Sequence, residues 1–103
     1  MLVLTIESVQ GREYQPLGLV KGSTIQTVNA FRDIGAGLKT IVGGELKKYN
    51  EMMDNARRIA TDRMVAQAEE MGADAIVGAR YSTSAIMQSA AEVMAYGTAV
   101  KFI

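Results

Sequence analysis

The residues from Glu45 to Met71 form the one long uninterrupted helical pattern in this 103-residue sequence. Apolar residues recur along it every three or four positions, which places them on one face of a 3.6-residue helix. They are Leu46, Tyr49, Met53, Ala56, Ala60, Met64, Ala68 and Met71. Gly43-Gly44 allows a turn before this stretch, and Gly72 stands where helices commonly end. We therefore expect a helix roughly 40 Å long that buries one face, at about 1.5 Å per residue.

The residues before this helix are typical of β-strands. Leu2–Ile6 alternates in the manner of a short strand, and Tyr14–Val28 is rich in β-forming residues. Pro16 cannot donate a ladder hydrogen bond, so it belongs at an edge or at the start of a strand. Gly18 and Gly22 indicate a bulge, a kink or the close approach of another backbone. Either two strands with a break or one long bent strand satisfies this pattern.

The residues after the helix predict two further strands, Ala75–Met87 and Ala91–Ile103, joined at Gln88–Ala90. Simple alternation divides the first strand between two faces. Ala75, Val77, Ala79 and Tyr81 would lie on one face, and Ile76, Gly78, Arg80 and Ser82 on the other. Before the long helix, Asn29 can cap a short helix. The apolar positions of that short helix would be Phe31, Ile34, Leu38 and Ile41.

These elements predict a single α+β domain over residues 1–103, a two-layer βαββ unit with the long helix on an antiparallel sheet. Only four charged residues, Asp74, Arg80, Glu92 and Lys101, lie between Ala73 and Ile103. Both faces of the sheet are therefore apolar or small, and one helix covers only one of them. Because large bare apolar patches are rare on monomers, the sequence favours self-association.

Composition excludes several classes of function. The chain has no cysteine and no histidine, which removes disulfides, thiol catalysis, the commonest general base and the commonest neutral metal ligand. The formal net charge of zero gives no attraction toward nucleic acid or anionic lipid. No apolar run approaches the ~20 residues of a membrane span, and the N-terminus lacks a basic signal-peptide region. We expect a cytoplasmic protein with no cofactor, no nucleic-acid partner and no membrane partner.

An ordered set of short motifs resembles the YbjQ family of small bacterial and archaeal proteins. The motifs are Gly18-Leu-Val-Lys-Gly22, Gly43-Gly44-Glu45, Tyr49, Ala56-Arg57-Arg58-Ile59-Ala60, Gly72-Ala-Asp-Ala75 and Ala95-Tyr-Gly-Thr-Ala-Val100. The resemblance implies a subunit similar to that of dodecin, with extra short strands that join subunits into a pentameric ring. The family's function is not established, and its label refers to heavy-metal binding. This chain departs from that label, because it has no cysteine or histidine ligand.

Three residues are candidates for ligand binding: Tyr49, Arg57 and Arg80. Tyr49 lies on the apolar stripe, where a core position is favoured over a ligand contact. Arg57 has only Asp54 as a helical partner, so it either stays a surface arginine or reaches an anion or another subunit. Arg80 interrupts an apolar strand and belongs at a sheet rim, across an interface or in a pocket. We identify no catalytic residues and no metal ligands.

Two functions from different classes remain. The sequence favours a non-enzymatic homo-oligomeric ring that binds a small ligand or metal ion at subunit junctions. The alternative is an enzyme whose active site is shared between adjacent subunits. For the ring, we expect the edge of Leu17–Val28 to pair with a neighbour, and Gly18, Gly22 and Gly97 to admit another backbone. Gly97→Val should then weaken assembly or folding, whereas Lys47→Ala should do neither.

Overall fold

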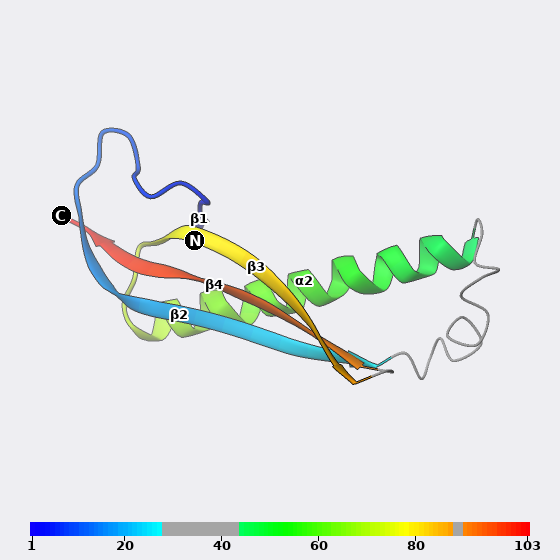
Figure 1. Cartoon of the computed structure of the whole chain (residues 1–103). Helices are drawn as coiled ribbons and strands as arrows, with labels where there is room; N and C mark the ends of the chain where they lie inside the picture. The colour runs from blue at the N-terminus through cyan, green and yellow to red at the C-terminus, as the bar shows by residue number, and fades with distance from the viewer. Residues whose placement is uncertain (28–43, 88–89) are drawn as a thin grey trace.

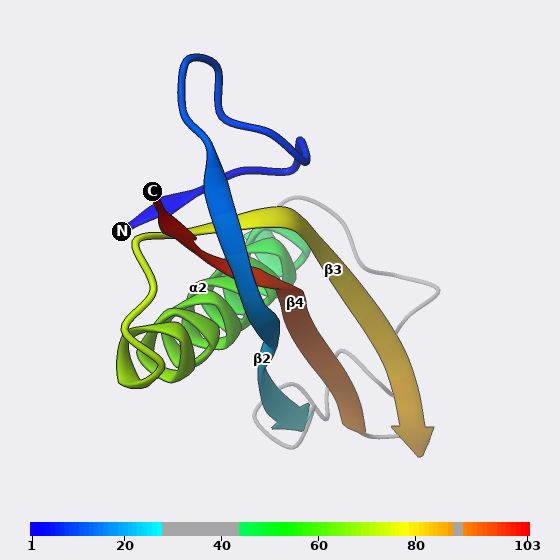
Figure 2. The same ribbon diagram turned by 90° about the vertical axis from the view of Figure 1, so that its left-hand side faces the viewer.

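In the computed structural model, which describes residues 1–27, 44–87 and 90–103, one long helix lies against one face of a four-stranded sheet (Figures 1 and 2). The elements are β1 (Leu2–Val3), β2 (Tyr14–Thr27), α2 (Gly44–Glu70), β3 (Ala75–Met87) and β4 (Ala90–Phe102). The strand order is β1-β3-β4-β2. The predicted α+β fold is confirmed. The sheet is mixed, because β1 joins it parallel to β3 while the other pairs are antiparallel.

The long helix α2 has the bounds that the sequence predicts, to within one residue at each end. Its C-terminus is a Schellman motif. Gly72 has a φ of 77°, its N–H donates to Glu69 O at 3.0 Å, and the N–H of Ala73 donates to Ala68 O at 3.1 Å. These bonds satisfy carbonyl groups that a helix end otherwise leaves without partners.

The core lies between the apolar stripe of α2 and the face of the sheet beneath it. The helix contributes small buried side chains and one larger one, and the strands contribute a matching set. The buried residues are Ala56, Ala60, Met64 and Ala68 of α2 with Val20, Ile76, Val93, Ala95 and Ala99 of the sheet. Because most of these side chains are alanine, the helix backbone approaches the sheet closely.

At two of the glycines where we expected another backbone to come close, the space beside the Cα atom is filled by other atoms of this chain. A Cβ on Gly22 would lie 2.2 Å from the backbone N of Met64. A Cβ on Gly97 would lie 2.8 Å from Cγ2 of Ile76 and 3.1 Å from the carbonyl oxygen of Val77. The expected close approach of another backbone is therefore confirmed, but that backbone belongs to this chain and not to a neighbouring subunit.

The N-terminal half resolves the alternatives that the sequence left open. Residues Tyr14–Thr27 form one continuous strand whose register with β4 shifts between Pro16 and Gly18. The first strand is shorter than predicted and ends at Val3. The chain nevertheless continues along β3, since the N–H of Leu4 donates to Ile76 O and the N–H of Gly78 donates to Ile6 O, both at 2.9 Å.

Strand β3 has the predicted bounds, but the predicted alternation fails beyond Gly78. Val77 is opposite Thr98 and Arg80 is opposite Tyr96, so β3 carries one extra residue at this point. Gly78 has a φ of 62°, the left-handed conformation that a bulge glycine adopts. The bulge moves Arg80 to the face of Val77, away from the helix. The predicted short helix at Asn29 and the Gln88–Ser89 part of the hairpin lie outside the described residues.

The chain is elongated. Its radius of gyration is 16.8 Å and its extents are 53 × 22 × 16 Å, whereas about 13 Å is usual for a domain of ~100 residues. The strand tips and the N-terminal end of α2 diverge from one another at one end (Figure 1). In the part of the chain that the structure describes, no helix has both the length and the apolarity that crossing a bilayer requires.

Candidate functional site

The sheet face opposite α2, here called the open face, is covered over only part of its length. Near the chain termini, Val9, Tyr14 and Phe102 pack onto the buried residues Ala75, Val77 and Val100. Beyond this small cluster the open face is formed by odd-numbered residues of β2, even-numbered residues of β4 and, from Arg80 to Ser84, even-numbered residues of β3. It is therefore the natural place to look for a binding surface.

Large apolar side chains are exposed on the open face and at the sheet tip. Leu19 and Ile25 lie on the open face, and Ile86 and Met87 lie near the sheet tip, with exposed fractions of 48–69%; the exposed ring of Tyr81 lies on the helix side of β3. Among the described residues, no strand pairs with the outer edge of β3 from Tyr81 to Met87. That segment contains no charge and no proline. An uncharged bare edge of this kind is suited to pairing with another chain.

At the opposite edge of the sheet, on β2, side chains of α2 form hydrogen bonds with some of the free backbone groups. The N–H of Lys21 donates to Oε1 of Gln67 at 2.7 Å, and Arg63 donates to the carbonyl oxygen of Ser23 at 2.6 Å. Two backbone groups within the predicted Leu17–Val28 pairing edge are therefore already bonded within the chain. The bare edge of β3 is the less protected of the two.

The structure does not bring the three predicted ligand residues together. Tyr49 and Arg57 are about two turns apart on α2, and Arg80 lies on the opposite side of the sheet. Tyr49 is 37% exposed rather than part of the core. The expectation of a core tyrosine was wrong because this half of α2 diverges from the strands (Figure 1).

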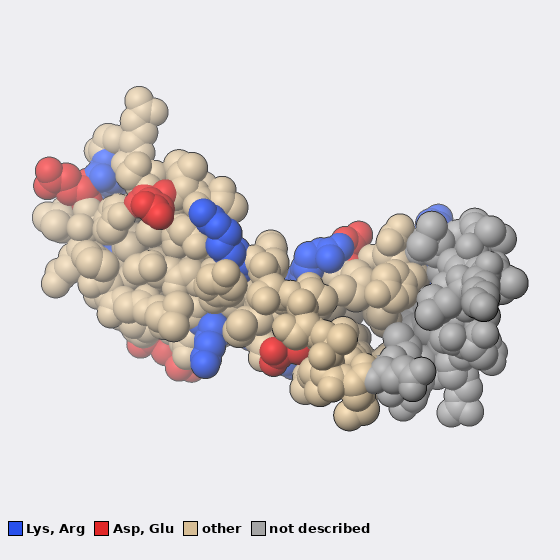
Figure 3. All heavy atoms as spheres, viewed as in Figure 1, with Lys and Arg blue, Asp and Glu red and all other residues tan. Residues whose placement is uncertain are grey.

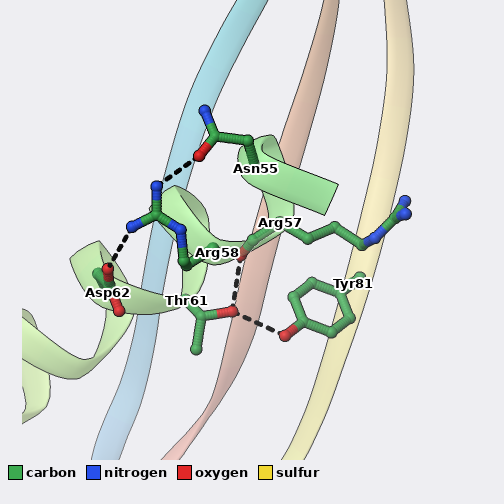
Figure 4. Close-up of polar contacts among 6 residues, drawn as sticks. All are labelled: Asn55, Arg57, Arg58, Thr61, Asp62 and Tyr81. Atoms are coloured by element: carbon green, nitrogen blue, oxygen red, sulfur yellow. Dashed lines mark hydrogen bonds and ion pairs between the residues drawn. The ribbon is translucent and has the colours of Figure 1, made fainter. Parts of the chain in front are cut away.

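The two consecutive arginines of α2 splay apart, as their spacing predicts (Figure 4). Arg57 is bound to Asp54 at 2.6 Å, and its guanidinium group points away from the Thr61 and Tyr81 hydroxyls in the view of Figure 4. Arg58 pairs with Asp62 at 3.7 Å on the other side. Both pairs are exposed, and exposed pairs contribute at most ~1 kcal/mol each.

Sequence reasoning missed a pair of hydroxyl groups next to the Arg57 backbone, those of Thr61 and Tyr81. Thr61 donates to the carbonyl oxygen of Arg57 at 2.7 Å, and its Oγ1 lies 2.7 Å from the Tyr81 hydroxyl (Figure 4). Because the Thr61 proton is engaged, the Tyr81 hydroxyl is the donor between the two. Tyr81 was assigned to the wrong face, since nothing in simple alternation indicates the bulge at Gly78.

Arg80 is held by backbone rather than by a carboxylate. Its Nη1 donates to the carbonyl oxygens of Thr5 at 2.8 Å and Ala79 at 2.9 Å. Within residues 1–27, 44–87 and 90–103, no Asp or Glu oxygen lies within ion-pair distance of Arg80 or of Lys21. Arg80 therefore keeps an uncompensated charge on the open face.

The residues present do not fit a heavy-metal site within one subunit. The whole chain lacks cysteine and histidine, and the described residues contain no group of three His, Cys, Asp or Glu side chains close enough to share an ion. Asp54 and Asp62 are each engaged by an arginine. On the face shown in Figure 3, charges of both signs are scattered over a mostly uncharged surface.

Comparisons with known proteins extend over the whole chain. The YbjQ family model, described as "Putative heavy-metal-binding", matches residues 1–103. UPF0145 proteins of Clostridium novyi and Alkaliphilus metalliredigens are 56% and 52% identical, and in both cases all of each chain is covered. A solved protein of unknown function from the DUF74 family of Pediococcus pentosaceus superposes with a TM-score of 0.73 at 19% identity, over 100% of this chain and 98% of that one. This structural likeness shows the fold alone.

Proposed function

The chain belongs to the YbjQ family, and on that premise we propose that it is a non-enzymatic homo-oligomer, assembled as a pentameric ring, that binds a small ligand where subunits meet. The ring of five is the arrangement that the family resemblance implies. Tyr49, Arg57 and Arg80 are the residues that we propose to contact the ligand or a neighbouring subunit.

The main support for self-association is the apolar surface that the chain leaves exposed to solvent. The accessible surface is 6830 Å², about 1,100 Å² more than the ~5,700 Å² usual for a compact monomer of this mass. A standard interface removes about 800 Å² from each partner. Pairing through the bare edge of β3 and contact through the open face would cover exposed apolar side chains such as Leu19 and Ile25.

Catalysis at a site shared by adjacent subunits remains the alternative. The Thr61 and Tyr81 hydroxyls, which are hydrogen-bonded to each other, are the observation that favours it. A nucleophile also needs a base and a group that orients the base. We find no such arrangement among the side chains that the structure describes, so binding is the better-supported function.

Light scattering tests the proposed assembly. At micromolar concentration we expect a mass five times that of the 11.1 kDa subunit. A mass equal to one subunit would contradict self-association. The mass of a dimer or trimer would support self-association but contradict the proposed ring of five.

A charge on the open face should break the assembly. We expect Ile25→Glu, at a side chain that is 58% exposed, to lower the mass measured by light scattering, because a carboxylate cannot be buried there without a partner. Ala66→Glu is the matched control, since Ala66 is exposed on the outer side of α2. Equal masses for both variants and the wild type would show that the face around Ile25 is not an interface.

Metal binding is tested by calorimetry with zinc at neutral pH. Because the chain has no cysteine or histidine, we expect no stoichiometric zinc binding tighter than micromolar. A clear one-to-one isotherm in that range would refute this expectation and support the description of the family.

A further inference from the structure

Three polar side chains form one row across the open face. Tyr96 of β4 is directly opposite Lys21 of β2 on one side and Arg80 of β3 on the other. The flanking residues Val20 and Gly97 are buried beneath the helix, which places the row on the opposite face. Adjacent strands are about 4.8 Å apart, so the two cationic residues begin about 10 Å apart with the tyrosine between them.

The bulge at Gly78 creates this row. Without the extra residue, Arg80 would alternate onto the helix face, where a guanidinium group would have to be buried. With it, Arg80 faces outward, and the carbonyl oxygens of Thr5 and Ala79 fix its Nη1. An arginine has five N–H donors, so the Nε and Nη2 donors remain for a ligand. The N-terminal segment thus fixes one end of the guanidinium group at the outer edge of β3, on the side away from β4.

The other two members of the row also retain capacity for binding. The Lys21 side chain is exposed, and Tyr96 is half-buried. Across the described residues, the Tyr96 hydroxyl and the Lys21 ammonium have no hydrogen-bond partner. The row therefore presents an ammonium, a phenol and a guanidinium group, all of which can donate to one acceptor.

The surroundings of the row favour a negatively charged ligand. The next row along the sheet is Ser23, Met94 and Ser82, which adds two hydroxyl donors around an apolar side chain. The nearest acidic residue on the open face of β4 is Glu92, four positions from Tyr96 and hence about 13 Å away. Two cations without local compensation are thus concentrated on a protein whose net charge is zero.

We infer that Lys21, Tyr96 and Arg80 form an oxyanion-binding row, which takes a phosphate or carboxylate group of a small molecule. This inference rests on the ligand-binding part of the proposed function and names the chemical class of the ligand. The oxyanion accepts from the phenol at the centre and from the Lys21 ammonium, while the Nε and Nη2 donors of Arg80, whose Nη1 stays bonded to Thr5 and Ala79, approach it from the β3 side. Met94 lies in the next row and contacts the less polar part of the molecule.

The test is a titration of the whole protein with inorganic phosphate, and separately with acetate, at constant ionic strength. NMR follows the Arg80 Nε–H signal and the Tyr96 ring signals. We expect saturable shifts in the millimolar range with at least one anion, and a three- to tenfold weaker affinity for Lys21→Gln, Arg80→Gln and Tyr96→Phe. Saturation with phosphate or with acetate identifies the preferred group. Saturation with neither anion would overturn the inference.

Lys48→Gln is the matched control, because it removes one exposed positive charge from α2, away from the row. If it weakens anion binding as much as Arg80→Gln does, the effect is general screening and the inference fails. The double variant Lys21→Gln, Arg80→Gln gives a further test. If it changes the mass measured by light scattering but leaves the anion-induced NMR shifts unchanged, the row is a contact between subunits and the inference of anion binding fails. Saturable binding by a monomeric protein would support the row while contradicting the proposed ring.

Discussion

Gly22→Ala is expected to destabilise the protein by about 3 kcal/mol or more, because the added methyl group would be forced into the helix backbone. The new Cβ would lie 2.2 Å from the backbone N of Met64 and 2.4 Å from the carbonyl oxygen of Ala60. Neither atom belongs to a side chain that can rotate away. The helix must move off β2 to make room, which opens the core between Val20 and Ala60.

Chemical denaturation followed by circular dichroism measures this effect. Ser23→Ala is the matched control, since Ser23 is the next residue of β2 and is only half-buried. Its carbonyl oxygen, which accepts from Arg63, remains in place, so the control should change stability by no more than about 0.5 kcal/mol. Wild-type stability for Gly22→Ala would show that α2 does not pack on β2 as closely as the structure places it.

The sequence was sufficient to predict the helix and the strands because their signals are local. The stripe of α2 repeats over the full length of the helix, and Gly72 marks its end. The strand bounds of β3 were predicted in the same way, from a run of β-forming residues between turns. In each case the residues that define an element also form it, so no distant contact was needed.

The candidate site could not be predicted, because it depends on register between strands. Arg80 was identified as unusual, but its position beside Tyr96 requires the bulge at Gly78 and the pairing of three strands. Lys21 gave no signal in the sequence, since an exposed lysine at a strand edge is common. The same limit explains Gly22, where the close approach of another backbone was correctly expected but was assigned to a neighbouring subunit instead of α2. The row and the packing of Gly22 both depend on which segments come into contact in the folded chain, and a local sequence pattern does not contain that information.

Gly97→Val is the second substitution from which we expect a large loss, about 3 kcal/mol or more of folding stability. The valine Cβ alone would lie 2.8 Å from Cγ2 of Ile76, 3.1 Å from the carbonyl oxygen of Val77 and 3.2 Å from Cα of Ala79. Ile76 can rotate, but the two backbone atoms belong to the bulge that positions Arg80. Two further methyl groups would press on the same residues, so the damage should spread to the register of β3 and to the oxyanion-binding row.

Thr98→Val is the control for this substitution, because it places the same side chain at the next position of β4. Thr98 is half-buried on the open face, opposite Leu19 and Val77, and the exchange should cost less than about 1 kcal/mol. Thermal unfolding and light scattering on both variants separate the two roles of Gly97. If Gly97→Val keeps the wild-type unfolding temperature but has a lower mass by light scattering, Gly97 lies between subunits. The contacts of its Cβ position predict instead that the unfolding temperature falls.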